Sequence, residues 1–441
     1  MGSRPPNVIF ILMDDMGWRD VGFMGNRFVE TPNLDRLAAG GLVFTQAYAS
    51  APNCAPTRAC LMSGQYPPRH GIYTVVDPRQ PAGSTWQPLL AAYSKSELSP
   101  QIITLAELLR DGGYATAFYG MWNLGRGRAG PVSPGGQGFQ QVVFPESLGF
   151  AKDAYKDDRG NYLSDRLTDE VLGFIEQHRD RPFFVYLADH AVHSPHDPKP
   201  DLLAKYEKKV SVGDEGRDDP AYAATIEAVD QNVGRIVDAL ARLKLTDQTL
   251  IVFTSDNGGT RPYAAPLAGG KGELYEGGIR VPLVVSWPGI KRPGRECSVP
   301  VSTVDWYPTL IELTGLKAPQ GQPLDGTSLV SVLDGESDLQ RESLFWHFPC
   351  YVGRATPSSA IRVGDFKLIE FFEGGGRREL YNLSVDPGEQ RNLAEVMPEK
   401  ADELYRRLRD WQTATGAAIP RQPNPNYDPR SARPRRGNRP R

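Results

Sequence analysis

The sequence has little cysteine, no strong net charge and no long hydrophobic run. Its 441 residues include four cysteines, too few for a disulfide framework in a chain of this size. The formal net charge of −3 gives no indication of a nucleic-acid partner. No apolar run approaches the length needed to span a bilayer, so we expect no membrane partner either.

The N-terminus lacks the pattern of a secretory signal peptide. Residues 1–6 lead directly into the first apolar segment, without a basic region followed by an apolar stretch and a cleavage site. We therefore expect a cytoplasmic protein, or a periplasmic or secreted one if a leader has been removed.

The charge is distributed unevenly along the chain. Residues 421–441 contain seven arginines and one aspartate, together with many prolines and asparagines and few apolar residues. Such a segment cannot form a packed core, so we expect a basic, disordered tail there. A contact with a polyanion is the alternative interpretation of this tail.

The segments that are rich in apolar residues indicate an α/β fold. The continuous apolar run from Val8 to Met13 is typical of a strand buried on both faces. Further strands alternate with helical patterns, with strands at 115–119, 182–187, 250–254 and 282–286 and helices at 33–39, 103–111, 164–178 and 220–243. This alternation predicts a large, mostly parallel sheet between helices, in a large domain over residues 7–336.

The pattern changes to short strands after about residue 336. These are expected at 344–348, 359–362, 366–372 and 379–382, and an amphipathic helix follows at 400–411. They predict a smaller C-terminal subdomain over residues 337–420, built as an antiparallel sheet with one helix. In the first domain, the long polar segment 74–100 is either a lid or binding loop or a peripheral insertion.

Two acidic pairs directly follow predicted strands. Asp14 and Asp15 follow the first strand, and Asp256 and Asn257 follow the strand that includes 250–254. Because the carboxyl ends of parallel strands lie along one edge of a sheet, the two pairs can meet there. Three carboxylates and an amide oxygen are hard ligands that suit Ca²⁺, with Mg²⁺ as the alternative ion. Each pair taken alone is equally consistent with a cap on the following turn or helix.

Cys54 begins the sequence Cys-Ala-Pro-Thr-Arg, which ends at Arg58 and is followed by Gly64. This motif, together with the acidic pairs, resembles the type I, formylglycine-dependent sulfatases, and in particular arylsulfatase-like bacterial members of the alkaline-phosphatase-like superfamily. The resemblance implies that a separate formylglycine-generating enzyme oxidises Cys54 to formylglycine. It also implies a metal site formed by the modified residue with Asp14, Asp15, Asp256 and Asn257. The alternative is that Cys54 is an ordinary buried thiol, as we expect for the other three cysteines.

Further blocks of the sequence extend the resemblance over about residues 7–417. Lys271 begins the sequence Lys-Gly-Glu-Leu-Tyr-Glu-Gly-Gly-Ile-Arg-Val-Pro, which resembles a family block whose lysine contacts the sulfate. The resemblance also implies that His193 acts as a general acid near the leaving-group oxygen. Arg58 is expected to hold the nucleophile with its fork of donors. The neighbouring His190 and His196 either face the substrate or are solvated, and we expect them to be solvated.

One block departs from the family pattern. Residues 120–125 read Gly-Met-Trp-Asn-Leu-Gly, where the family usually has Gly-Lys-Trp-His-Leu-Gly. Met121 supplies no charge, and Asn123, the candidate catalytic side chain that remains here, can form hydrogen bonds but cannot act as a base. Three explanations stay open: a double substitution that traps the enzyme, natural variation with compensating residues, and a protein that binds sulfate esters without turnover.

Together these observations predict a sulfatase that acts on a sulfated carbohydrate or an aryl sulfate. Arg79 and Trp86 in the 74–100 segment, and the aromatic stretch 346–351, are candidates for lining a sugar site. One alternative is a catalytically impaired or silent sulfoglycan-binding homologue. Another is a phosphonate monoester or phosphodiester hydrolase, which would share the nucleophile and the metal site.

Overall fold

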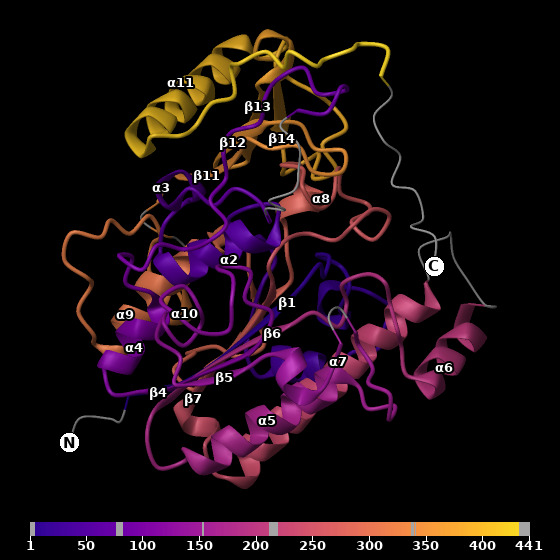
Figure 1. The fold of residues 1–441 in the computed structure, drawn as a ribbon, viewed down its shortest axis with the longest axis vertical. Coiled ribbons are helices and arrows are strands. Elements are labelled where there is room, and N and C mark those ends of the chain that lie inside the picture. Colours follow the sequence, from indigo (N-terminus) through magenta and orange to yellow (C-terminus); the bar gives the residue numbers. More distant parts are fainter. Residues whose placement is uncertain are drawn as a thin grey trace.

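The computed structural model describes residues 5–75, 83–151, 154–210, 219–336, 339 and 341–431. The predicted fold class is confirmed: a large mixed sheet lies between helices, and a small antiparallel sheet with one helix packs at one end of it (Figure 1). None of the helices in these ranges is long and apolar enough to cross a membrane.

The large sheet has eight strands in the order β5-β4-β6-β1-β7-β8-β2-β9. Their bounds, in that order, are Gln141–Val143, Ala115–Gly120, Phe183–Asp189, Asn7–Met13, Thr249–Ser255, Leu283–Ser286, Leu42–Phe44 and Arg295–Cys297. The strands from β5 to β7 are parallel, whereas β8 pairs antiparallel with both β7 and β2. The carboxyl ends of β1, β6 and β7 therefore lie side by side at one edge.

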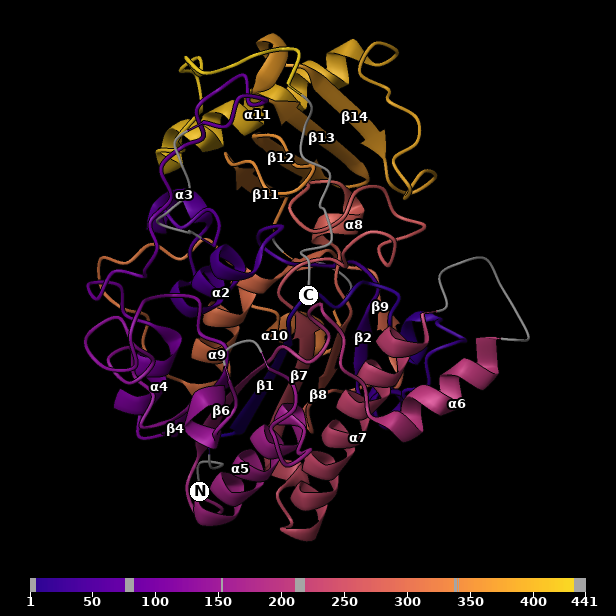
Figure 2. The same cartoon turned by 45° about the vertical axis from the view of Figure 1, so that its right-hand side comes forward.

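Helices cover both faces of this sheet (Figure 2). Alternate residues of β1 point to opposite faces. Val8, Phe10 and Leu12 point into a core completed by α2, α4, α9 and α10 (Cys54–Ser63, Leu105–Asp111, Trp306–Thr314 and Val330–Leu333). Ile9, Ile11 and Met13 point into a second core completed by α1, α5 and α7 (Pro32–Ala39, Leu163–Gln177 and Pro220–Arg242). Helix α6 (Pro200–Val210) packs on α7 through Leu202 and Tyr206. A strand with both faces buried explains the unbroken apolar run at 8–13.

The small sheet has the strand order β11-β12-β13-β14, with bounds Ser343–Phe348, Ser358–Val363, Phe366–Phe371 and Arg378–Asn382. One of its faces packs against α11 (Pro398–Thr415) through Leu368 and Leu404, among others. The other face contacts the large domain, where the Trp346 indole N–H donates to the Ala49 carbonyl oxygen at 2.9 Å. Short elements complete the fold: β3 (Ala47–Tyr48), β10 (Val301–Ser302), α3 (Pro67–His70) and α8 (Glu276–Ile279).

Part of the expected disordered tail is packed against the molecule. Residues 421–431 lie along the segment that starts at residue 83, and the buried Asn424 side chain donates to the carbonyl oxygens of Ser84 and Gln87, both at 2.8 Å. The disorder predicted for residues 421–431 is not observed, because composition gives no indication of hydrogen bonds to distant backbone groups. Residues 432–441 lie outside the described residues.

Candidate active site

The two acidic pairs meet at the carboxyl edge of the large sheet. Both continue the strand ladder, since the Asp14 N–H donates to the Asp189 carbonyl oxygen at 3.1 Å and the Asp256 N–H donates to that of Met13 at 3.0 Å. The neighbouring strands β1 and β7 thus bring residues that are more than 240 positions apart in the sequence into contact. This is the arrangement that the strand order predicts for side chains at this edge.

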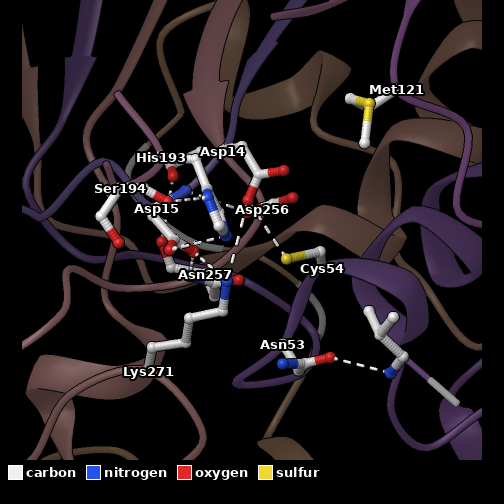
Figure 3. Close-up of polar contacts among 12 residues, drawn as sticks. Asp14, Asp15, Asn53, Cys54, Met121, His193, Ser194, Asp256, Asn257 and Lys271 are labelled. Carbon is white, nitrogen blue, oxygen red and sulfur yellow. Dashed lines mark hydrogen bonds and ion pairs between the residues drawn. The ribbon is translucent and has the colours of Figure 1, made fainter. Parts of the chain in front are cut away.

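Asp14, Asp15, Cys54 and Asp256 form a compact buried cluster (Figure 3). One ligand atom from each of them lies within 4.8 Å of all the others. Asn257 joins the cluster by donating its amide N–H to Asp15 Oδ1 at 2.8 Å. The side-chain oxygen of Asn257 is buried, and among the described residues it has no hydrogen-bond partner. A buried orphan acceptor beside three carboxylates fits a hard cation that prefers oxygen ligands.

Cys54 is the first residue of α2, and its position follows from that helix start. The preceding Asn53 is extended and does not cap the helix with its side chain, so the first-turn N–H groups are left for other partners. The thiol Sγ lies 3.2 Å from Asp14 Oδ1. Burial and the nearby Asp14 carboxylate raise the pKa of the Cys54 thiol well above its usual value. An unmodified Cys54 would therefore be a protonated thiol, a weak nucleophile.

Arg58 lies one turn further along α2, where the helical spacing turns it towards the same cluster. Its fully buried guanidinium donates through Nε and Nη2 to Asp256 Oδ2 at 3.0 and 2.8 Å, and through Nη2 to Asp14 Oδ2 at 3.1 Å. Its Nη1 donates to the Met121 carbonyl oxygen. Burial alone would lower the pKa of Arg58, but the Asp256 and Asp14 carboxylates outweigh it and raise the pKa. Arg58 is thus a permanent positive charge inside the cluster.

Lys271 and His193 close the cluster towards solvent. Lys271 Nζ lies 2.5 Å from Asp15 Oδ1 and 3.9 Å from Asp14 Oδ1. His193 follows β6, and its Nε2 lies 3.6 Å from Asp15 Oδ2, with 40% of the side chain exposed. Its Nδ1 is 2.8 Å from the Ser194 carbonyl oxygen, so Nδ1 carries the proton in that contact and Nε2 faces the site.

The charges of the cluster are not balanced by its own cations. Burial alone would raise the pKa of Asp14, but Arg58 and Lys271 outweigh it and hold the pKa well below the usual range. Burial and the Asp14 charge raise the pKa of Asp256 in spite of Arg58. Three carboxylates thus share two positive side chains.

The block that departs from the family pattern lies beside the cluster. Met121 follows β4 and contributes its carbonyl oxygen to Arg58, while its side chain stands apart without a polar contact (Figure 3). Asn123 has a left-handed backbone with φ of 59°. Among the interactions of the described residues, none joins the Asn123 side chain to the acidic cluster. The loop at 120–125 therefore lies beside the site, but the side chains of Met121 and Asn123 bring no charge to it.

The prediction that His190 is solvated is wrong, and His196 is half-buried. His190 is 5% exposed, and burial lowers its pKa. The His196 ring packs against Tyr222 and Tyr263, with centroid distances of 4.9 and 5.9 Å. Both histidines follow β6, and the His190 ring packs on Tyr155 at a centroid distance of 5.1 Å. These are tertiary contacts that the local sequence does not reveal.

The segment predicted as a lid or an insertion packs at the junction of the two domains. The Trp86 ring meets that of Tyr351 edge-on at 5.3 Å, and the Leu90 N–H donates to the Gln422 carbonyl oxygen at 2.9 Å. The Asn53 side-chain oxygen accepts from the Val75 N–H at 3.1 Å, which ties the start of the segment to the residue before Cys54. Arg79 lies outside the described residues.

The structure also contains a buried ionic cluster that was not predicted from the sequence. Lys367 of β13 pairs with Glu276 and Glu389 at 3.0 and 2.9 Å, and all three side chains are fully buried. The available signal was a lysine inside the largely apolar strand 366–371.

The three other cysteines, predicted to be buried thiols, are buried and free, which confirms that prediction.

Comparisons with known proteins identify the family of the chain. Residues 6–316 match the family described as Sulfatase, and residues 270–414 match N-sulphoglucosamine sulphohydrolase, C-terminal. The chain is 33% identical to a sulfatase of Formosa agariphila, covering 93% of this chain and 89% of that protein. It is 31% identical to arylsulfatase A of Homo sapiens, covering 93% and 87% of the two proteins. The crystal structure of Ps i-CgsB in complex with k-i-k-neocarrahexaose superposes with a TM-score of 0.78 at 28% identity, covering 92% of this chain and 93% of that one.

The sulfatase match spans every residue of the acidic cluster, together with Arg58, His193 and Lys271. The chain therefore belongs to the sulfatase family, within the alkaline-phosphatase-like superfamily, and is a sulfuric ester hydrolase.

Proposed function

We propose that this sulfatase hydrolyses a sulfate ester of a sulfated carbohydrate, using a formylglycine made from Cys54 and a calcium ion. The observation that carries the proposal is the position of Cys54. Its side chain lies at the start of α2, 3.2 Å from Asp14 and four residues before Arg58, inside the acidic cluster. A purely structural cysteine gains nothing from a place among carboxylates, whereas a nucleophile that works with a metal needs it.

The residues present fit a calcium ion. The ligands would be Asp14, Asp15, Asp256, the Asn257 side-chain oxygen and the modified Cys54. When bound there, calcium supplies positive charge that orients and activates the oxygen nucleophile. Mg²⁺ is the alternative ion, and the choice between the two depends on how many ligands the site supplies.

The hydrated aldehyde offers two hydroxyl groups, one to attack sulfur and one whose deprotonation releases sulfate. Arg58 holds the two carboxylates and the nucleophile in place with fixed donors. Lys271 approaches from the solvent side and binds the sulfate oxygens. His193 acts from its doubly protonated form: Nδ1 keeps its proton on the Ser194 carbonyl oxygen, and Nε2, which faces the site, gives its proton to the leaving-group oxygen.

A carbohydrate substrate is supported by two related proteins and by the exposure of His193. The related structure with 28% identity was solved with a neocarrahexaose bound, and an N-acetylgalactosamine-6-sulfatase of Canis lupus familiaris is 29% identical over 96% of this chain. His193 is part-exposed, so the leaving group faces an open side of the site rather than an enclosed apolar pocket. An aryl sulfate would react at the same atoms and is the practical test substrate.

Turnover of paired esters tests the proposal. The protein, co-expressed with a formylglycine-generating enzyme and supplied with calcium, should hydrolyse the sulfate ester of a phenol faster than its phosphonate monoester. Cys54→Ala should remove this activity, and Cys60→Ala, the matched control on the same helix, should retain most of it. Faster phosphonate turnover would favour the phosphonate hydrolase, and no turnover of any sulfate ester would contradict the proposal.

A second candidate, a silent sulfoglycan-binding protein, is favoured by one specific observation. Met121 offers the site only its carbonyl oxygen, and the Asn123 side chain has no contact with the cluster among the described residues. Such a protein would bind a sulfated oligosaccharide tightly and release it unchanged. Product analysis after binding separates the two candidates.

A further inference from the structure

The ionic cluster of Lys367, Glu276 and Glu389 joins the C-terminal subdomain to the catalytic domain. Lys367 Nζ lies 3.0 Å from Glu276 Oε1 and 2.9 Å from Glu389 Oε1, and no solvent reaches the three side chains. Glu276 Oε2 accepts from the Tyr48 hydroxyl at 2.7 Å, and Glu389 Oε2 accepts from the Glu276 backbone N–H at 2.6 Å. Burial alone would raise the pKa of Glu276, but the Lys367 charge outweighs it and keeps the pKa below its usual value.

The partner of Lys367 belongs to the same short segment as Lys271. Glu276 starts the four-residue helix α8, five positions after Lys271, and the segment between 269 and 278 contains five glycines. Glycines give this segment little rigidity of its own, because they add backbone freedom and no side-chain packing. Glu276 is the only charged side chain of the segment without exposure, so its contact with Lys367 is the buried ionic anchor of the segment. The buried Leu274 and the hydrogen bond from the Tyr275 hydroxyl to Glu379 anchor the same segment to the small sheet.

Movement of this segment would be transmitted directly to the active site. The Lys271 N–H donates to the Gly259 carbonyl oxygen at 3.0 Å, two residues after Asn257. The Gly272 N–H donates to the Pro52 carbonyl oxygen at 2.7 Å, two residues before Cys54. At the other end, the Gly258 N–H donates to the Gly278 carbonyl oxygen at 3.0 Å. A side chain at Gly258 would collide with the Gly277 carbonyl oxygen, so the two backbones are in direct contact.

The position of Lys271 is especially important in this chain. In the parts that the structure describes, Lys271 is the only lysine paired with Asp14 or Asp15. Met121 supplies no second positive charge from the opposite loop. Sulfate binding by a lysine side chain therefore depends on one segment, and Glu276 of that segment pairs with Lys367 of the other domain.

We propose that Lys367, through Glu276 and with the support of Glu389, is a positioning residue that holds Lys271 at the sulfate-binding site. The C-terminal subdomain thereby sets the sulfate affinity of the catalytic domain without touching the substrate. This inference rests on the proposed role of Lys271 as the sulfate ligand.

The test compares Lys367→Met with Leu368→Ala in the full-length, matured and calcium-loaded protein. Leu368 is the next residue of the same strand, is equally buried and faces α11 instead of the cluster, so both variants remove a buried contact of one subdomain. The two readouts are KM for an aryl sulfate and the dissociation constant for inorganic sulfate by calorimetry. Since displacements of about 1 Å can cost large factors, both should rise about tenfold or more in Lys367→Met and change less than about twofold in Leu368→Ala.

Glu389→Gln provides the second variant if Lys367→Met does not fold. It keeps the size of the side chain and an acceptor for the Glu276 N–H, and it removes the charge that Lys367 meets. We expect a rise of about threefold in both constants. Unchanged constants in Glu389→Gln or in folded Lys367→Met would overturn the inference, and so would equal losses in Leu368→Ala. Because sulfate binding needs no turnover, a failure of the proposed reaction would be seen separately, in the parent protein.

Discussion

Arg58→Met is the change whose effect can be worked out most directly from the structure. Arg58 forms three N–H contacts of 2.8 to 3.1 Å with Asp14 and Asp256, and the side chains of the three residues are at most 4% exposed. Water cannot screen the two carboxylates once the guanidinium is lost, and breaking a buried pair in this way costs about 3–5 kcal/mol. With an unfolding entropy of about 2.1 cal/mol/K per residue, a chain of this length should lose about 3–5 °C in its melting temperature.

The loss should be smaller when calcium is present, because a divalent cation compensates the same carboxylates. The assay is thermal unfolding of the parent and of Arg58→Met, each in a chelator and in excess calcium. Arg341→Met is the matched control, since Arg341 pairs with the fully buried Asp305 and contacts none of the expected ligands. That variant should lose stability equally with and without calcium. A loss below about 1 kcal/mol in Arg58→Met, the value of an exposed pair, would refute the reasoning.

Three further changes have defined outcomes. Replacing Met121 by Lys and Asn123 by His should raise kcat by about 10²-fold or more by returning a charged donor, and an unchanged kcat would count against the missing charge as the limiting feature. Asn257→Ala should weaken calcium binding about tenfold or more in calorimetry, because it removes the orphan oxygen, and unaltered affinity would exclude Asn257 as a ligand. Burial raises the pKa of Asp20 to about 6 in spite of its hydrogen bond from Tyr222, so the folded protein holds this proton more tightly than the unfolded chain. Stability should therefore fall as pH rises from 3.8 to about 6, and Asp20→Asn should remove up to about 3 kcal/mol of that fall in denaturant titrations, whereas an identical pH profile would contradict this assignment.

The large sheet was predictable because its strands are unusual in composition. Segments buried on both faces, such as 8–13 and 250–254, contain almost only apolar residues and stand out from the amphipathic helices between them. The predicted helices at 220–243 and 33–39 differ from α7 and α1 by one residue at one end. Helix α6 was not predicted. Only Leu202 and Tyr206 of its 11 residues are buried, so its apolar face is short.

Which site residues lie close together could be predicted from the sequence only where the order of the strands brings them together. Asp14 and Asp256 follow neighbouring parallel strands, so their meeting follows from the topology. The surroundings of His190 and the cluster around Lys367 depend on contacts between distant elements, which no local pattern records. Likewise, the composition of residues 421–431 gives no sign that Asn424 is bound by backbone carbonyls.

The mass of the tryptic peptide 37–58 tests the central claim most directly. It contains Cys54 as its only cysteine, and the following peptide, 59–69, contains Cys60 as an internal control. After co-expression with a formylglycine-generating enzyme, the account predicts that the first peptide loses one sulfur and two hydrogens and gains one oxygen, while the second is unchanged. An unmodified thiol at Cys54 under these conditions would contradict the proposed nucleophile, and equal change in both peptides would show unspecific oxidation instead of maturation.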